Sequence, residues 1–246
     1  MAIKPLAENR QPTRPKAGAE NTDLMVCVAA AELRDHDVVF VGIGLPSLAC
    51  NLALATHAPN LTLIYESGTI GSRPNRIPLS IGDPALVTGS LMVTPMIDVF
   101  QLLLQRGHID VGFLGAAQID RHGNINTTVI GSYDKPKVRL PGSGGAAEIA
   151  AHAKRVLVVT KLDKRAFPAK VDFITSPGDR VARVITDKCI FDRENGELVL
   201  SALFDGVSAD DVRASVGWDL RSARSITAVE LPSAPIVQTL REISGT

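Results

Sequence analysis

The chain has 246 residues, and its 26 Lys and Arg balance 26 Asp and Glu to a formal net charge of zero. The length suits one large α/β domain or two small ones, and the balanced charge gives no overall field toward nucleic acid or an anionic membrane. Three cysteines without a CxxC pair argue against a disulfide framework or a zinc cluster, and no stretch reads as a membrane span or a signal peptide, so we expect a cytoplasmic protein.

The start of the chain differs in composition from the rest. Residues 1–21 carry three prolines among Lys, Arg, Asn and Gln, which is typical of a flexible arm. A first helix is then expected with Asn21 or Thr22 as its cap. We predict one α/β domain over residues 22–246.

Strands and helices alternate through the next part of the chain. The predicted strands are Val38–Val41, Leu61–Tyr65, Ile109–Leu114, Ile125–Ile130 and Arg155–Thr160, and the predicted helices are Ser47–Ala55, Ile97–Gln105 and Ala147–Ala153. Such alternation is typical of parallel crossover units. The expected fold class is α/β, with a mainly parallel, doubly wound sheet and helices on both faces.

The last third changes character, because its short strands follow one another without helices. The predicted elements are strands at Ala182–Thr186, Lys188–Phe191 and Leu198–Leu203, a hairpin turn at Glu194–Gly196, a helix from Ser208 to Ser215 and a last helix Ala234–Ile243. Consecutive strands joined by tight turns pair antiparallel. We therefore expect some antiparallel strands in this part of the sheet.

Glu66 stands directly after the predicted strand Leu61–Tyr65 and before Ser67 and Gly68. In open α/β sheets, ligands bind beyond the carboxyl ends of the strands, so a carboxylate there is a candidate base, metal ligand or nucleophile. The alternative is a strand-end acid that pairs with an arginine or caps the next turn. Ser67 is the weaker nucleophile candidate because no GxSxG elbow surrounds it.

A second candidate site is the glycine-rich stretch from Gly142 through Gly144 and Gly145 to Ala146, which precedes a predicted helix. Small residues let backbone N–H groups approach a ligand at a helix N-terminus, where negative charge is favoured. The alternative is a turn that requires positive φ and holds no ligand.

Other patterns point to no cofactor. Gly42 and Gly44 match only part of a dinucleotide fingerprint, and neither a phosphate-binding GxxxxGK[ST] loop nor an HExxH zinc helix occurs. The histidines show no metal-ligand spacing, so no metal site is predicted. Several basic residues flank the candidate sites and form either a ligand contact or a solvated face, namely Arg73, Arg76, Lys135, Lys137 and Arg139.

Four motifs taken in order carry a family resemblance. They are Glu66–Gly68, Gly115–Asp120, Gly123–Thr128 and Gly142–Ala146. This set resembles the β subunit of family I coenzyme A transferases. Four further stretches look like the branch of the 3-oxoadipate and glutaconate CoA-transferases, namely Val39–Ser47, Tyr65–Gly68, Pro78–Asp83 and Lys135–Gly142. The likeness covers roughly residues 22–218.

The resemblance implies that Glu66 is a nucleophile that forms an acyl-glutamyl anhydride and then a glutamyl-CoA thioester. It also implies that Gly142, Gly144 and Gly145 approach CoA by their backbone, with Ser67 beside them. Gln118 and Asn126 are implied to line the pocket. CoA is then a substrate and covalent intermediate, and no cofactor is bound permanently.

The resemblance further implies a separate α subunit that completes the site, in an αβ heterodimer or an α2β2 assembly. The expected reaction moves CoA from a donor such as succinyl-CoA to a dicarboxylic or 3-oxo acid, and 3-oxoadipate is the acceptor that we expect. Alternatives are one chain of a glutaconate CoA-transferase, an acyl-CoA or ring-cleaving hydrolase on the same scaffold, and a non-catalytic nucleotide-binding protein. A short connection after Gly178 departs from the 3-oxoadipate type and bears on acyl specificity.

Overall fold

The computed structural model describes residues 19–74 and 76–245, with side chains from residue 21 onward. Helix α1 (Ala19–Ala31) begins before the predicted caps, so Asn21 and Thr22 lie inside its first turn. The predicted arm otherwise falls outside the described residues. The division into an arm and a single domain stays a prediction.

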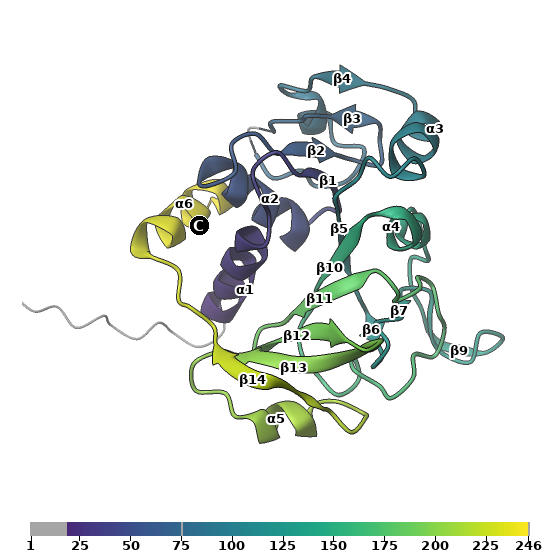
Figure 1. The fold of residues 1–246 in the computed structure, drawn as a ribbon. Helices are drawn as coiled ribbons and strands as arrows, with labels where there is room; N and C mark the ends of the chain where they lie inside the picture. The colour runs from purple at the N-terminus through teal and green to yellow at the C-terminus, as the bar shows by residue number, and fades with distance from the viewer. Residues whose placement is uncertain (1–18, 75, 246) are drawn as a thin grey trace, which may run out of the picture.

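A ten-stranded sheet forms the centre of the molecule, in the order β14-β13-β12-β11-β10-β5-β1-β2-β3-β4 (Figure 1). Its strands are β1 (Val38–Val41), β2 (Thr62–Ile64), β3 (Thr69–Ile70), β4 (Met92–Val93), β5 (Val111–Gly115), β10 (Arg155–Val159), β11 (Val181–Ile185), β12 (Cys189–Glu194), β13 (Glu197–Leu203) and β14 (Ser222–Ala228). The five adjacent strands β11, β10, β5, β1 and β2 pair parallel. The predicted mainly parallel sheet is therefore confirmed.

Antiparallel pairs occur on both sides of this parallel centre, and the edge strand β14 pairs parallel with β13. β12 pairs antiparallel with β11 and β13, as predicted for the last third, and the hairpin turn places Asn195 at φ 52° and Gly196 at φ 84°. At the other end, β2, β3 and β4 also pair antiparallel. The sequence pattern did not predict β3 and β4, because two residues are too few to show an alternation.

Helices cover both faces of the sheet, as predicted. α1, α2 (Leu45–Ala55) and α6 (Ala234–Ser244) pack on one face, and α4 (Ala146–His152), α5 (Ala209–Ala214) and the π-helical segment η2 (Val99–Leu104) pack on the other. The alternation along β1 explains the two cores, since Phe40 faces the second group of helices while Val39 and Val41 face the first. The remaining helices are α3 (Met96–Asp98), which leads into η2, and the 3-10 helix η1 (Pro84–Val87).

The predicted strand Ile125–Ile130 is wrong as a single element. The structure divides it between two small antiparallel pairs, β6 (Gln118–Ile119) with β7 (Ile125–Asn126), and β8 (Val129–Gly131) with β9 (Pro136–Arg139). The Asn126 side chain causes the break, because its Oδ1 accepts hydrogen bonds from the Thr128 and Val129 amides at 2.9 and 3.2 Å. An Asn side chain that bonds to the following backbone replaces a strand ladder with a turn.

No helix in residues 19–74 or 76–245 combines the length and the apolar character needed to cross a membrane.

Candidate active site

Glu66 lies at the tip of the turn that joins β2 to β3. The Tyr65 amide donates to the Thr69 carbonyl at 3.0 Å, and the Gly68 amide donates back to the Tyr65 carbonyl at 2.9 Å. These two bonds close a three-residue turn, with Glu66 half-buried and Ser67 exposed. The predicted place of Glu66, directly beyond a buried strand, is confirmed.

Two neighbours of Glu66 hold the turn in place: the backbone of Gly68 and the side chain of Tyr65. Gly68 has φ 103°, its carbonyl accepts from the Thr94 amide at 2.9 Å, and a Cβ there would collide with the Thr94 carbonyl oxygen. The Tyr65 side chain is buried and its hydroxyl shares a hydrogen bond of 3.1 Å with Ser47 of α2. Burial raises the pKa of the Tyr65 phenol to about 12, so the ring is a neutral anchor at neutral pH.

The glycine loop lies directly against the Glu66 carboxylate. A Cβ placed on Gly144 would lie 3.8 and 3.9 Å from the two carboxylate oxygens, and one on Gly145 would lie 3.4 Å from the carboxyl carbon. Gly144 also has φ 48°, which favours glycine. The structure therefore brings together Glu66, Gly144 and Gly145, which the sequence analysis had selected separately.

The glycine loop is held by backbone and hydroxyl contacts. Gly142, at φ 97°, donates its amide to the Thr127 carbonyl at 2.8 Å, and the Thr127 hydroxyl donates to the Gly142 carbonyl at 2.8 Å. On the other side, the Ser143 hydroxyl accepts from the Ala147 amide at 3.2 Å and fixes the first turn of α4. Gly142 is thus an anchor of the loop, while Gly144 and Gly145 are its part beside Glu66.

Gln118 and Asn126 are both buried, and their hydrogen bonds join them to each other. Asn126 donates to the Gln118 side-chain oxygen at 2.7 Å, and Gln118 donates to the Asp172 carboxylate at 3.1 Å. The Gly131 amide donates to the same carboxylate at 2.8 Å. Among the described residues, no hydrogen bond connects this network to Glu66, so a pocket-lining role for Gln118 and Asn126 stays a prediction.

Two site residues have no distinct signal in the sequence. Thr127 anchors the glycine loop, and Phe100 of η2 places its ring so close to Gly145 that a Cβ there would lie 2.6 Å from Cζ. Thr127 stands next to Asn126 in a motif that the sequence analysis used, but its contact with Gly142 depends on tertiary structure. Phe100 reads as one apolar residue of an ordinary helix.

The three arginines among the basic residues that flank the candidate sites are engaged elsewhere. Arg76 forms a two-pronged pair with Asp83 at 2.7 and 2.7 Å, and this hydrogen bonding holds the pKa of the Asp83 carboxyl well below its usual range. Arg73 donates to the Pro59 carbonyl at 2.8 Å, and Arg139 lies over the Tyr133 ring at 4.9 Å. Within residues 19–74 and 76–245, the Glu66 carboxylate has no ion pair or hydrogen bond, so the alternative of a structural acid paired with an arginine does not describe it.

Two cavities of the structure lie away from Glu66. A cavity of about 740 Å³ is bounded by α1, β12 to β14 and the segment before α6, and one of about 500 Å³ lies between α2 and α6. Glu66 lines neither of them. No group of three or more His, Cys, Asp or Glu side chains in the described part of the chain is arranged to hold a metal ion. The half-buried carboxylate therefore lies outside both cavities, beside the glycine loop.

Comparisons with known proteins identify relatives of this chain. A family model described as Coenzyme A transferase matches residues 24–215. The chain is 47% identical to the B-type subunit of the 3-oxoadipate CoA-transferase of Pseudomonas knackmussii, over 92% of this chain and 94% of that relative. It is 31% identical to the B-type subunit of the glutaconate CoA-transferase of Acidaminococcus fermentans, over 90% of this chain and 91% of that relative.

Solved structures show the same fold. The glutaconate coenzyme A-transferase of Acidaminococcus fermentans superposes with a TM-score of 0.85 at 29% identity, covering 91% of this chain and 94% of that one. The decarboxylase AibA/AibB superposes with a TM-score of 0.84 at 28% identity, covering 92% and 95%. The match of sequence and fold over nearly the whole chain shows that this protein belongs to the coenzyme A transferase family.

Proposed function

We propose that this chain is the B-type subunit of a CoA-transferase and that Glu66 carries CoA as a covalent thioester. The observation that supports this role is the Glu66 carboxylate, which stands free of ion pairs among the described residues and lies against the backbone of Gly144 and Gly145. A carboxylate is a weak nucleophile, so it depends on close positioning and on donors around the oxyanion that forms.

The proposed reaction proceeds in balanced steps. A Glu66 carboxylate oxygen attacks the thioester carbonyl of the acyl-CoA, the C–S bond breaks, and CoA leaves as a thiolate. The thiolate then attacks the Glu66 carbonyl of the anhydride, and the acyl group leaves as a free carboxylate. An acceptor acid reverses the two steps, which divides one difficult exchange into easier ones. CoA is thus substrate and intermediate, and the proposal requires no permanently bound cofactor.

We assign 3-oxoadipate as the acceptor and succinyl-CoA as the donor. The assignment rests on the 47% identity to one chain of a 3-oxoadipate CoA-transferase, against 31% for one chain of a glutaconate CoA-transferase. A cytoplasmic setting fits a protein that works on CoA thioesters. Ser67, Gln118 and Asn126 stay in the proposed substrate-binding set with the glycines of the loop.

A panel of acceptor acids tests the assignment. With succinyl-CoA and the co-purified partner subunit, we expect 3-oxoadipate to be converted at least about tenfold more efficiently than glutaconate, a difference of about 1.4 kcal/mol in transition-state binding. Acyl-CoA formation is followed by chromatography. Release of free CoA without any acceptor would instead support the hydrolase alternative. A preference for glutaconate would support the alternative that this chain belongs to a glutaconate CoA-transferase.

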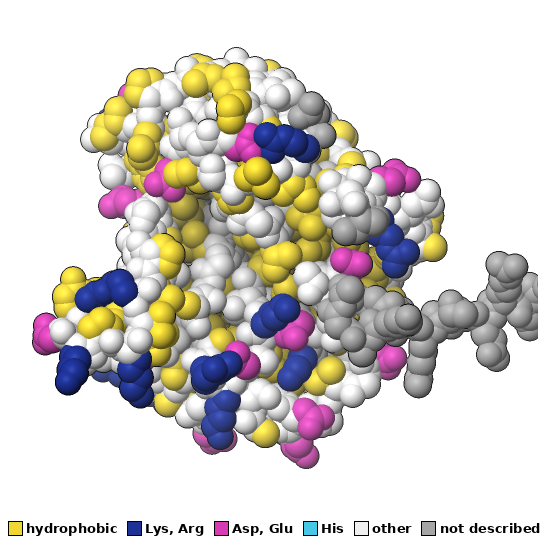
Figure 2. All heavy atoms as spheres, turned by 180° about the vertical axis from the view of Figure 1, so that it is seen from behind, with side chains coloured by type: hydrophobic (Ala, Val, Ile, Leu, Met, Phe, Trp, Pro, Cys, Tyr) yellow, Lys and Arg dark blue, Asp and Glu magenta, His cyan; other side chains and the backbone are white. Residues whose placement is uncertain are grey.

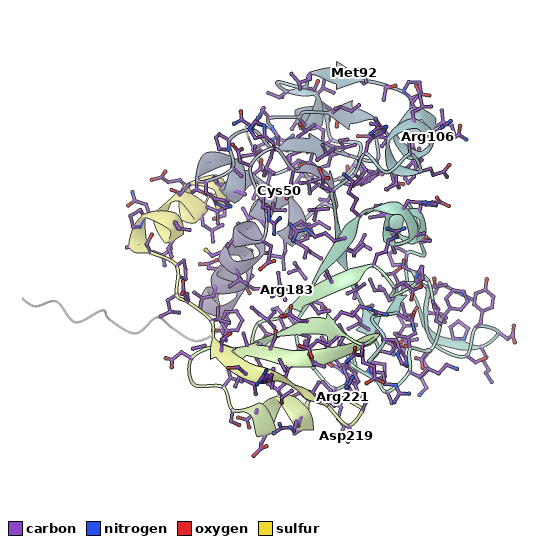
Figure 3. The ribbon with its side chains drawn as sticks, in the orientation of Figure 1. Cys50, Met92, Arg106, Arg183, Asp219 and Arg221 are labelled. Carbon is purple, nitrogen blue, oxygen red and sulfur yellow. The ribbon has the colours of Figure 1, made fainter. Side chains whose placement is uncertain are left out.

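The proposed partner is an α subunit that docks beside Glu66, in an αβ or α2β2 assembly. Exposed apolar side chains gather on β4, α3 and η2, and we call this surface the β4 patch: Leu91, Met92, Val93, Met96, Ile97 and Leu102. Figure 2 shows hydrophobic side chains on the upper lobe, where Figure 1 places β3 and β4, and Figure 3 shows Met92 at this outer edge. An uncovered apolar edge strand is a liability unless another chain covers it.

The β4 patch is continuous with the turn that carries Glu66, because the Thr94 amide between β4 and α3 donates to the Gly68 carbonyl. We place the second chain over this patch and beside the turn that carries the carboxylate. The proposed site is complete only when both chains are present.

Replacing Leu91 by Asp is expected to lower the affinity for the α subunit about 30-fold, the effect of losing one interface anchor. Leu91 is 81% exposed, so the variant chain should fold normally. Binding is measured by titration of the separately purified subunits. Leu231, exposed before α6 and lining the 740 Å³ cavity, provides the control L231D, which should bind like the unchanged chain. Equal affinity of L91D and L231D would contradict the assignment of the β4 patch.

A further inference from the structure

The helix that carries Phe100 is irregular at the point nearest to Glu66. α3 leads without a break into η2, where hydrogen bonds connect residues five apart: the Gln105 amide donates to the Phe100 carbonyl and the His108 amide to the Leu103 carbonyl, both at 2.9 Å. A π-type turn is rare, and it redirects side chains relative to a regular helix. The side chains of this turn therefore need to be compared with one another.

Phe100 differs from the core residues of the same turn. Val99 and Leu104 are fully buried, whereas Phe100 is only half-buried. One side of its ring packs on Phe40 of β1, with centroids 5.5 Å apart and ring planes at 53°. Phe100 is therefore not simply a core residue, since part of its surface stays outside the core.

The tip of the Phe100 ring and the Glu66 carboxyl group flank the same point of the glycine loop. A Cβ on Gly145 would lie 2.6 and 3.0 Å from the ring atoms Cζ and Cε1, and 3.4 Å from the Glu66 carboxyl carbon. The ring is thus a neighbour of the carboxyl group, and the bare Gly145 backbone lets both approach. An apolar wall beside a carboxylate keeps water away from it and limits its movement.

We infer that Phe100 is a positioning residue of the transfer reaction: presented by the π turn of η2, its ring holds the Glu66 carboxyl group against Gly145 and shields the intermediates on Glu66 from water. The inference rests on the proposed covalent role of Glu66. Shielding matters because water competes with the acceptor acid. If water attacks the glutamyl-CoA carbonyl, the C–S bond breaks, free CoA and the Glu66 carboxylate are released, and an acyl-CoA has been hydrolysed.

The experiment measures the partition between transfer and hydrolysis in the complete complex with its α subunit. For F100A we expect the ratio of CoA release to CoA transfer to rise about tenfold, while kcat of transfer falls and KM for the acyl-CoA changes less than about twofold. F100L, which keeps most of the apolar volume, should lie between F100A and the unchanged complex. It also serves as the test variant if F100A does not assemble.

Leu103 provides the matched control, because it lies in the same π turn, is half-buried and packs on the same core, and is not among the nearest neighbours of a Cβ placed on Gly144 or Gly145. L103A should lose stability without a change in the partition ratio. A ratio that is unchanged in both Phe100 variants, or that rises equally in L103A, would overturn the inference. A separate mass spectrum of the unchanged complex with acyl-CoA distinguishes the two proposals, since absence of a CoA adduct on the peptide with Glu66 contradicts the covalent role itself.

Discussion

Replacing Glu66 by Gln is expected to lower CoA transfer by on the order of 10⁶-fold, the scale seen when an enzyme loses its nucleophile. The amide is nearly the same size as the carboxylate, so the turn between β2 and β3 should stay intact. Glu66 makes no ion pair or hydrogen bond among the described residues that the change would break. The loss should therefore be chemical, because an amide oxygen does not attack a thioester under these conditions.

Three measurements separate this loss from a loss of structure. Transfer is assayed in the assembled complex, and CoA binding is measured by calorimetry. The mass of the peptide that contains Glu66 is measured by mass spectrometry after incubation with acyl-CoA. E66Q should bind CoA and carry no adduct, whereas the unchanged chain carries one that hydroxylamine removes. The acid-to-amide control is E230Q, at an exposed residue beside the 740 Å³ cavity, which should transfer normally. Turnover that survives in E66Q would mean that another residue carries CoA.

Adding one methyl group at Gly145 is expected to be the second most damaging single change at the site. In G145A the new Cβ would meet the Phe100 ring at 2.6 Å and the Glu66 carboxyl carbon at 3.4 Å, so the ring must move and the carboxyl group has little room. Overpacking of this kind costs about 1–3 kcal/mol of stability. A shift of the carboxyl group by about 1 Å should lower kcat about 100-fold.

Thermal unfolding and single-turnover transfer are measured on the same preparation of G145A. The control is G82A, because a Cβ at Gly82 meets only the Ser80 hydroxyl at 3.9 Å and no positive φ opposes the change. It should retain stability and activity. The double variant G145A/F100L tests the cause, since a smaller side chain at position 100 should restore part of the lost kcat. If F100L restores none of the lost kcat, the clash with the Phe100 ring is not the cause of the loss in G145A.

The sequence predicted the parts of this molecule that depend on local pattern. The strand at Val38–Val41 and the hairpin at Glu194–Gly196 follow from apolar runs and turn chemistry, and the structure confirms both. The short helix predicted from Ser208 is confirmed as α5, and the structure adds that Ser208 caps it, because its hydroxyl accepts from the Asp211 amide at 3.1 Å. Glu66 was found because a charged side chain directly after a buried strand is itself a local signal.

What the sequence did not show depends on contacts between distant segments. The π turn of η2 has the same apolar pattern as an ordinary helix, so the position of Phe100 over Gly145 required the structure. Asn126 illustrates the opposite error, because it was assigned to a strand but bonds to the backbone that follows it and breaks that strand. Its side chain meets Gln118, a partner that only the fold provides.

The order of strands in the sheet has a consequence for how the site arises during folding. Glu66 follows β2 and the glycine loop precedes β10, and β1 and β5 lie between these two strands. The carboxylate and the loop therefore meet only after β2, β1, β5 and β10 have paired, and long-range parallel pairing is slow. A nascent chain that ends at β5 contains Glu66 without the loop that positions it. The proposed nucleophile is thus not positioned for transfer until the centre of the sheet has formed.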